Sequence, residues 1–400
     1  MAKKNFSGSE WQKIHDLTRT RGEEFGLPKR RPGSIVMGSF NIRKLGAQEK
    51  KTAGSWQMMS LIAERYDLIG IQEVQDDLSG LNHLKSSLGK NYGLVASDIT
   101  GGYPGRGASP ERLAFLFRWA TVERTEIASD ITYDRSSVIG TLFDHRNEFF
   151  TAFGDHSTAL DKWELENKKR KREGKKSKAK PVVHLPEFVT FIRQPLCVSF
   201  QVAGADGAES YRFLAVNAHL LYGKYKDERY KEFLALVEWL VDRARNANRM
   251  YYPNIILFGD CNLDFRKSKT KRRVVDDFIK SMNKKDLKGA RAKINFPFLD
   301  THPGQADVFA TNARLSETYD QIGLVVHDKR LPVSDKNQLA GTIGANGFDY
   351  GVFNFVDLFS QALHGKNFKA ITALQKKTLL SKFEHDFTDH MPIWMRLPKP

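Results

Sequence analysis

Six short polar motifs, spread over most of the chain, carry the side chains that could do chemistry. They are SFNI with Asn41, IQEV with Glu73, NAHL with His219, GDCN with Asp260 and Asn262, TYDQI with Asp320, and TDHMP with Asp389 and His390. Nearly every motif stands at the downstream end of a short apolar run, and such runs are typical of buried strands. Carboxylates, amides and histidines gathered where strands end suit a divalent cation and an acid/base pair acting on a phosphate ester.

Each motif predicts a particular kind of contact. Glu73 is the best single candidate for a metal ligand, because hard cations such as Mg²⁺ bind one or two carboxylates besides water and substrate oxygens. Asn41 fits a contact to phosphate or to a metal-bound water. His219 ends an apolar run, and a neutral imidazole there can exchange a proton near pH 7. Asp260 and Asn262 fit a carboxylate and an amide aimed at an attacking water and a phosphate oxygen.

Asp389 and His390 form a second acid/base or metal group beside Pro392. Taken alone, Glu73 would be an exposed strand-end glutamate and Asn41 a turn or cap residue. The functional interpretation therefore depends on the motifs occurring together. Among the remaining histidines, only His302 in FLDTHPG keeps a context worth following.

Strands must position these side chains. Apolar runs predict strands near residues 35–42, 67–74, 93–100, 112–119, 189–202, 211–220, 254–260, 318–326 and 391–397. Helical periodicity is found at 55–66, 78–88 and 227–247. Because strands outnumber helices and often follow one another directly, we predict an α+β fold, a four-layer α/β/β/α sandwich of two mixed β-sheets flanked by helices.

The chain divides into two parts of unequal length. Residues 1–33 are expected to form an N-terminal helical extension and basic connector, and residues 34–400 a single catalytic domain. The run WELENKKRKREGKKSKAK (163–180) lies in a basic insertion at about 155–186, expected to be a mobile loop or a frayed helix. A second insertion candidate, 328–348, is rich in Gly, Asn and Lys.

Composition narrows the class of partner. The 400 residues include 63 Lys and Arg against 47 Asp and Glu, a formal net charge of +16, so the protein should be drawn to nucleic acid or to an anionic membrane face. Only Cys197 and Cys261 are present, so no disulfide framework is visible. No signal-peptide pattern and no transmembrane segment are found, and a cytoplasmic protein is expected.

Together these motifs resemble the endonuclease/exonuclease/phosphatase superfamily. SFNIRKLG, RYDLIGIQEV and ERLAFLFR are most similar to its deoxyribonuclease I branch, and the likeness runs from about Ile35 to Leu397. The resemblance implies a Mg²⁺ enzyme, with Mn²⁺ or Ca²⁺ as other possible ions. The implied metal ligands are Glu73, Asp389 and Asn41; the implied catalytic residues are His219 paired with Glu111, His390 paired with Asp320, and Asp260 with Asn262; the implied phosphate contacts are Arg43 and Arg193.

Two positions depart from the deoxyribonuclease pattern. Gln75 stands where that branch has an arginine that enters the minor groove, and Ser109 stands where it has a groove-contacting tyrosine. We therefore expect the catalytic chemistry to be retained and the contacts to duplex DNA to differ.

The leading hypothesis is a metal-dependent phosphodiesterase, a nuclease that hydrolyses DNA by histidine acid/base catalysis on a Mg²⁺-activated phosphate. One alternative is a phosphoinositide phosphatase or a sphingomyelinase-like phosphodiesterase, and another is a non-catalytic nucleic-acid-binding module. The Lys168–Lys180 run is either a clamp for a polyanion or a solvated loop. An unexported nuclease would threaten its own genome, so a regulatory partner protein is a further hypothesis.

Overall fold

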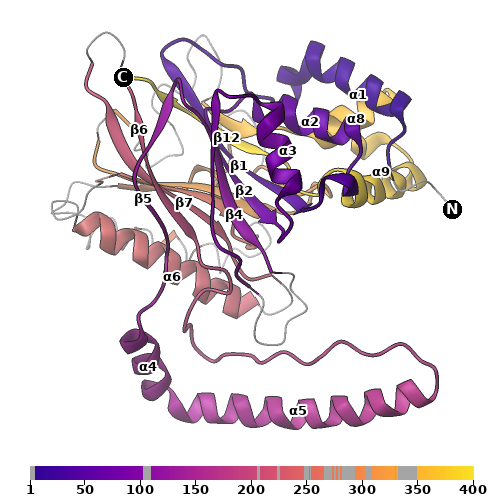
Figure 1. Cartoon of the computed structure of the whole chain (residues 1–400), viewed down its shortest axis with the longest axis vertical. Helices are drawn as coiled ribbons and strands as arrows, with labels where there is room; N and C mark the ends of the chain where they lie inside the picture. Colours follow the sequence, from indigo (N-terminus) through magenta and orange to yellow (C-terminus); the bar gives the residue numbers. More distant parts are fainter. Residues whose placement is uncertain are drawn as a thin grey trace.

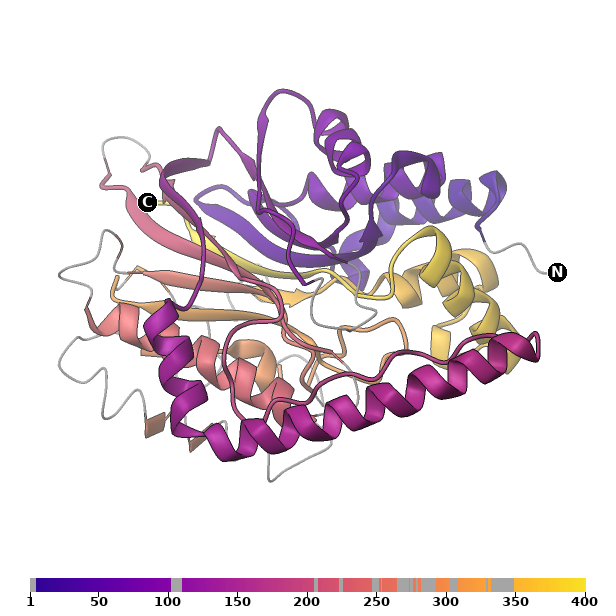
Figure 2. The same cartoon turned by 60° about the horizontal axis from the view of Figure 1, so that its bottom comes forward.

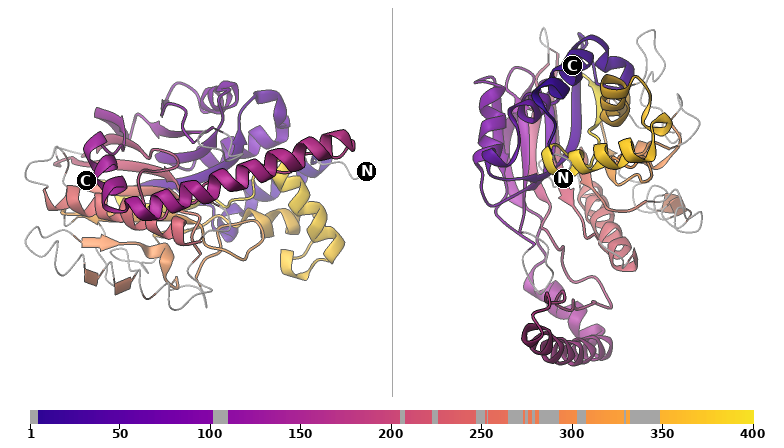
Figure 3. Two further views of the ribbon diagram at one scale, coloured as in Figure 1. Left: turned by 90° about the horizontal axis from the view of Figure 1, so that it is seen from below. Right: turned by 90° about the vertical axis from the view of Figure 1, so that its right-hand side faces the viewer.

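Two six-stranded mixed β-sheets stack face to face at the centre of the computed structural model (Figure 1). The structure describes residues 5–101, 110–204, 208–222, 226–246, 252, 254–264, 273, 276–277, 280–281, 293–302, 308–328, 330–331 and 349–400. Helices cover the outer faces of both sheets, so the predicted α+β sandwich is confirmed (Figure 3). Ser109 and most of the second insertion candidate lie outside the described residues.

The first sheet carries the N-terminal motifs. Its strands, in order across the sheet, are β11 (Tyr350–Val352), β12 (Ile393–Pro398), β1 (Ser34–Leu45), β2 (Leu68–Val74), β4 (Arg112–Arg118) and β3 (Tyr92–Ala96). Strands β1 and β2 run parallel, and the other neighbouring pairs are antiparallel. The helix α2 (Ala53–Ala63) makes the crossover that a parallel pair needs.

The second sheet carries the central motifs. Its order is β5 (Val122–Asp130), β6 (Leu196–Val202), β7 (Tyr211–His219), β8 (Ile255–Asp260), β10 (Asp320–Val326) and β9 (Lys293–Asn295). Strands β7 and β8 are parallel, with helix α6 (Lys226–Arg245) between them in the chain. The register places His219 and Asp320 directly opposite Asp260, one on each neighbouring strand.

Helices flank the two sheets unequally. Helices α1 (Gly8–Arg21), α2, α3 (Ser79–Ser87), α8 (Phe355–His364) and α9 (Ala373–Asp386) lie on the side of the first sheet, and α6 lies on the side of the second (Figures 1 and 3). Short 3₁₀ turns are η1 (Gly22–Phe25), η2 (Gln48–Lys50), η5 (Pro297–Leu299) and η6 (Phe368–Ala370). Among the described helices, none is both long enough and apolar enough to cross a membrane.

A buried polar bridge joins the two sheets. Asn217 of β7 donates from Nδ2 to the carbonyl oxygens of Ile71, at 3.0 Å, and Ala114, at 2.9 Å. Its Oδ1 accepts from Nε2 of Gln72 at 2.6 Å. Because buried amides are costly unless they are hydrogen-bonded, these bonds favour one alignment of the sheets.

The N-terminal extension packs on the main body. A capping box between Ser7 and Glu10 begins α1. Asp386, at the end of α9, accepts hydrogen bonds from the backbone of Phe6 at 2.9 Å, from Trp11 Nε1 at 3.3 Å and from Thr52 Oγ1 at 2.8 Å. Asp386 therefore has a structural role that ties α1 to α9.

The basic insertion differs from its expectation. Between β5 and β6 the chain forms α4 (Arg135–Asp144) and α5 (Arg146–Arg172), so a regular helix of 27 residues contains the first half of the basic run. Asp134 caps α4 by accepting from the backbone of Ser137 at 2.7 Å. Within α5, Ala, Leu, Glu and Lys are strong helix formers, and their propensity outweighs the repulsion among the cations.

Candidate active site

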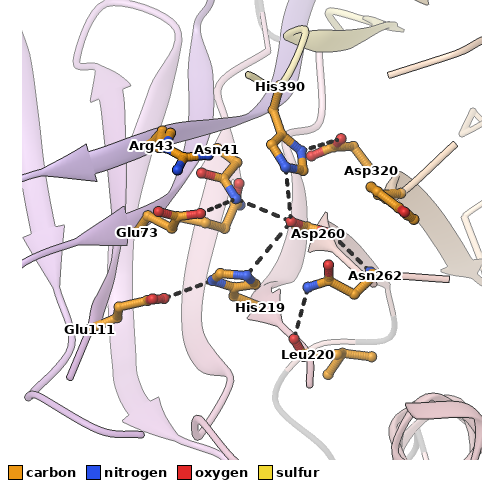
Figure 4. Close-up of polar contacts among 12 residues, drawn as sticks. Asn41, Arg43, Glu73, Glu111, His219, Leu220, Asp260, Asn262, Asp320 and His390 are labelled. Carbon is orange, nitrogen blue, oxygen red and sulfur yellow. Dashed lines mark hydrogen bonds and ion pairs between the residues drawn. The ribbon is translucent and has the colours of Figure 1, made fainter. Parts of the chain in front are cut away.

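The predicted motifs meet at one end of the sandwich, where they converge from both sheets (Figure 4). The backbone is strained there: Lys44, Glu73 and Asn262 have φ values of 50°, 60° and 51°, in the left-handed region that non-glycine residues rarely adopt. The β1–β2 and β2–β4 registers also shift beside Glu73. Such bulges and strained residues re-aim side chains, and they concentrate at functional sites.

The first histidine–carboxylate pair joins the two sheets. His219, the last residue of β7, lies with Nδ1 2.8 Å from Oε2 of Glu111, which directly precedes β4. Both side chains are buried. Although burial by itself raises the pKa of Glu111, the hydrogen bond with His219 and the charge of Arg193 lower it. An ionised Glu111 fixes the ring orientation of His219 and leaves Nε2 facing the site.

The second pair also joins the two sheets, but here the histidine belongs to the first sheet and the carboxylate to the second. His390, just before β12, lies with Nδ1 2.9 Å from Oδ2 of Asp320, the first residue of β10. Burial alone lowers the pKa of His390, but the charges of Asp320 and Asp260 raise it well above its usual value. Burial raises the pKa of Asp320 against the effect of His390. The charges of Asp320 and Asp260 therefore favour the protonated form of the His390 ring.

Asp260 stands between the two pairs. Its Oδ2 lies 3.6 Å from Nε2 of His219 and 3.6 Å from Nε2 of His390. Its Oδ1 accepts the backbone N–H of Asn262 at 2.9 Å. Burial would raise the pKa of Asp260, but the charges of the two histidines outweigh it and lower the pKa. An ionised carboxylate with two imidazoles around it can orient a water and exchange its protons.

Asn262 presents an amide beside this carboxylate. Its Nδ2 donates to the carbonyl oxygen of Leu220 at 3.0 Å. The guanidinium of Arg229 donates to the backbone carbonyl oxygen of Asn262. These bonds hold Asn262 in its left-handed conformation, next to the backbone that follows His219.

Asn41, Glu73 and Asp389 carry oxygen atoms suited to a hard cation. Asn41 Nδ2 donates to Glu73 Oε1 at 3.2 Å and to Asp260 Oδ2 at 3.1 Å. Asn41 Oδ1 and Asp389 Oδ1 are buried, and neither has a hydrogen-bond partner among the described residues. Since buried oxygens normally find a partner, these atoms and the Glu73 carboxylate fit the all-oxygen coordination that Mg²⁺ prefers.

A second group is also compact enough to hold an ion. Ligand atoms of Asp260, Asp320 and His390 all lie within 4.8 Å of one another. A histidine binds metals through a neutral imidazole, and the charges of Asp320 and Asp260 raise the pKa of His390, so an ion bound at this second group would have to displace a proton. The oxygen group around Glu73 requires no such loss of a proton from a histidine.

The two predicted phosphate-binding arginines have different positions. Arg43 is partly exposed at the mouth of the site, where its Nη1 pairs with Asp389 Oδ2. Arg193 is 1% exposed, and it pairs through Nε with Glu111 Oε2 at 2.9 Å and through Nη2 with Glu111 Oε1 at 3.2 Å. The prediction that Arg193 faces a nucleic-acid phosphate is corrected: its guanidinium is used inside the protein to hold Glu111.

Two residues near the site had no signal in the sequence. Lys51 donates from Nζ to the carbonyl oxygen of Phe387 at 2.5 Å, and burial lowers its pKa to about 8 despite the nearby carboxylates of Asp386 and Glu73. Its place in the polar run QEKKT indicated only a solvated surface. Glu232 of α6 is buried behind His219, and only the close packing of α6 on this end of the sheet reveals it. His302, in contrast, packs its ring on Phe309 and Tyr350 outside this group.

No family model and no curated protein matches this sequence. Solved structures that resemble the chain include an endonuclease/exonuclease/phosphatase family protein from Bacteroides thetaiotaomicron, 13% identical with a TM-score of 0.44, over 92% of this chain and 95% of that one. A mannosyl-6-phosphatase from the same organism is 12% identical with a TM-score of 0.44, over 90% and 98%. The human Nocturnin catalytic domain with bound sulfate gives 12% and 0.44, over 92% and 95%. The function of this chain is therefore inferred from the side chains of its site, and not from these neighbours.

Proposed function

We propose that this protein is a metal-dependent phosphodiesterase of the endonuclease/exonuclease/phosphatase superfamily, and that it is a nuclease acting on DNA. One observation carries the proposal: the Asp260 carboxylate lies 3.6 Å from two imidazoles, each of which is backed by a buried carboxylate. Hydrolysis of a phosphate diester needs a group that takes a proton from water and a group that protonates the leaving oxygen. This arrangement offers both.

The two histidines have different roles in this scheme. His390, in its protonated form, donates its Nε2 proton to the leaving oxygen. His219, on the other side of Asp260, takes the proton of the attacking water through Nε2. Asp260 orients that water, and Asn262 donates to a phosphate oxygen. Glu111 and Asp320 stabilise the charge on each ring through Nδ1.

The cation would be held by Glu73, Asn41 and Asp389. Mg²⁺ is the proposed ion, and Mn²⁺ or Ca²⁺ fit the same oxygen set. When bound, the cation supplies charge that neutralises the phosphate in the transition state. Arg43, which interacts electrostatically with both Asp389 and Glu73, adds a positive charge at the mouth.

DNA is the proposed substrate because the chain carries a net charge of +16 and retains Glu111 as the partner of His219. The decisive experiment compares the wild type with His219→Ala and Glu73→Ala on supercoiled plasmid DNA, with Mg²⁺ or EDTA. We expect each variant to lose at least about two orders of magnitude in nicking rate. His385→Ala, an exposed histidine at the end of α9, is the matched control and should keep full activity.

Other outcomes would replace the proposal. Full nicking activity in His219→Ala would remove the acid/base scheme. Release of inorganic phosphate from a phosphoinositide, or cleavage of sphingomyelin, without nicking of DNA would identify a lipid esterase. Salt-sensitive DNA binding with no turnover in any metal would indicate a non-catalytic binding module. Cleavage of RNA alone would make RNA, and not DNA, the substrate.

A further inference from the structure

We propose that α4, α5 and the segment 173–192 form an arm, residues 135–192, that binds the backbone of a nucleic acid outside the catalytic cleft. The proposal rests on the proposed function and deepens it, because it makes a long polymer, and not a short oligonucleotide, the preferred substrate.

The arm projects from the sandwich. Figures 1 and 3 show α5 below the body, separate from both sheets, and in Figure 2 it runs across the front of the molecule toward α9. At about 1.5 Å per residue, the 27 residues of α5 span roughly 40 Å. Residues 146–167 of this helix carry two basic and five acidic side chains, so the contact to a nucleic acid is expected at the far end, roughly 40 Å from the start of α5.

The far half of the arm holds much of the charge of the protein. Residues 168–180 contain nine Lys and Arg against one Glu, a net of +8, which is half of the +16 of the whole chain. Lys178 pairs with Glu166 and Lys175 pairs with Glu173. The other seven cations form no ion pair with any residue that the structure describes, and nearly all are exposed. Such a cluster attracts a polyanion and gains free energy by releasing its counterions.

The root of the arm, where the arm joins the sandwich, packs beside the first histidine–carboxylate pair. Phe149 of α5 is buried, and the returning segment is tied to α6 by His184 Nδ1 to Glu228 Oε1 at 2.7 Å and by Lys231 Nζ to Glu187 Oε1 at 2.8 Å. The returning segment leads directly to Arg193, which pairs with Glu111. The root of the arm therefore lies at the end of the sandwich where His219 is found, and a long polymer held at the basic far end could also reach the cleft.

Nucleic acid fits the basic end better than a membrane does. Helices that lie on membranes combine basic residues with large apolar ones that enter the lipid. Residues 166–180 contain no apolar residue except Ala179. The exposed apolar side chains Phe143, Phe150 and Phe153 lie nearer the root, and Leu165 is the one exposed large apolar side chain next to the cations. A single leucine does not make the apolar face of a membrane-bound helix, so the basic end fits a contact to phosphates better.

The test removes charge from the arm without removing the helix. In the arm variant, the five cations of Lys168–Arg172 are changed to Gln, which is also a good helix former. The control variant changes five exposed lysines of the body to Gln, namely Lys13, Lys90, Lys366, Lys369 and Lys377. Both full-length proteins are compared on kilobase DNA and on a dinucleotide, and DNA binding is measured against salt in a His219→Ala background.

We expect the arm variant to raise KM for kilobase DNA at least about tenfold and to leave dinucleotide turnover within about twofold. The slope of log K against log salt should become shallower by roughly 0.9 for each phosphate that the arm no longer neutralises, and the control should keep the wild-type slope. An unchanged slope and KM, an equal effect in the control, or loss of binding to anionic vesicles with DNA binding intact would overturn the arm proposal. If no protein cleaves the dinucleotide or the kilobase DNA, the proposed function fails, whereas the binding slope still decides the role of the arm.

Discussion

Arg193 and Glu111 form a buried ion pair, with Arg193 Nε 2.9 Å from Glu111 Oε2, and that same oxygen faces Nδ1 of His219 at 2.8 Å. One carboxylate oxygen is thus shared between the guanidinium of Arg193 and the imidazole of His219. The geometry makes Arg193 a positioning residue, because it fixes the carboxylate that in turn fixes the ring of His219.

Arg193→Lys should therefore impair turnover without abolishing metal binding. Lysine supplies a point charge in place of a planar guanidinium, whose Nη2 donates to Glu111 Oε1 and whose Nε forms the ion pair with Oε2. We expect kcat to fall at least about tenfold with little change in KM, and the NMR signals of the His219 ring to move because its carboxylate partner is displaced. Arg212→Lys, at an exposed position of β7, is the matched control. A kcat equal to wild type with unchanged NMR signals of the His219 ring would contradict the positioning role.

The raised pKa of His390 predicts a particular dependence on pH. If His390 donates a proton, kcat is lost as the pH rises through its pKa, and Asp320→Asn removes a charge that keeps this pKa high. The alkaline limb of the kcat profile should then move to lower pH, and kcat should fall. Asp76→Asn, at an exposed position, should leave the profile unchanged.

The same shift affects stability. Because the folded pKa of His390 exceeds the unfolded value of about 6.5, its contribution to the free energy of unfolding is complete below about pH 6.5 and is lost as the pH rises through the folded pKa. Denaturant titrations of wild type and Asp320→Asn across this range measure the difference. An alkaline limb that stays in place in Asp320→Asn would assign the proton to another group.

Metal binding should stabilise the protein through Glu73. A ligand at about 100 times its Kd stabilises the folded state by about 2.7 kcal/mol, so Mg²⁺ should raise the Tm of the wild type and EDTA should reverse the rise. Glu73→Gln should lose most of this effect, and Glu123→Gln on β5 should keep it. If Glu73→Gln keeps the rise and Asp320→Asn loses it, the ion is held by Asp260, Asp320 and His390 instead.

Glu232 predicts a second pH-dependent step. Its Oε1 accepts the N–H of Ile192 at 2.8 Å and its Oε2 accepts the N–H of Leu221 at 2.5 Å, so it holds the backbone beside Arg193 and His219. Burial raises its pKa to about 7 against the effect of these N–H groups and the charges of Arg193 and His219. Since only the ionised carboxylate accepts with both oxygens, kcat should rise as the pH passes about 7.

Glu232→Gln should lose this acidic limb, because the amide turns an N–H₂ group toward a backbone N–H. Its unfolding free energy should also fall less between about pH 4.5 and 7, where the raised pKa makes the wild-type protein lose stability as the pH rises. Glu238→Gln on the exposed side of α6 is the control. A variant with the wild-type kcat profile would show that Glu232 does not position the site.

The strands that carry the motifs could be predicted because they are apolar runs with polar ends. Strand β5 could not, since Val122 and the alternating exposed charges after it are typical of an edge strand with one solvated face. The run at 189–202 was predicted as one strand, but the strand begins at Leu196. Pro195, directly before it, cannot donate to a neighbouring strand.

The two histidine–carboxylate pairs show which contacts could not be predicted from the sequence alone. His219 and Asp260 could be selected by type and position, but Glu111 and Asp320 lie 108 and 70 residues from their histidines. Only the register of the folded sheets or a family resemblance brings such partners together. The burial of Arg193 also could not be predicted, because nothing in the sequence indicates that its guanidinium pairs with a buried carboxylate.

Each histidine stands on one sheet and its carboxylate on the other. A chain that ends before β12 lacks His390, so the second histidine–carboxylate pair cannot form in it. Under the proposed function, such a chain would stay inactive until β12 is made and inserts between β1 and β11. Truncated products of a nuclease built in this way would be harmless to the genome that encodes them.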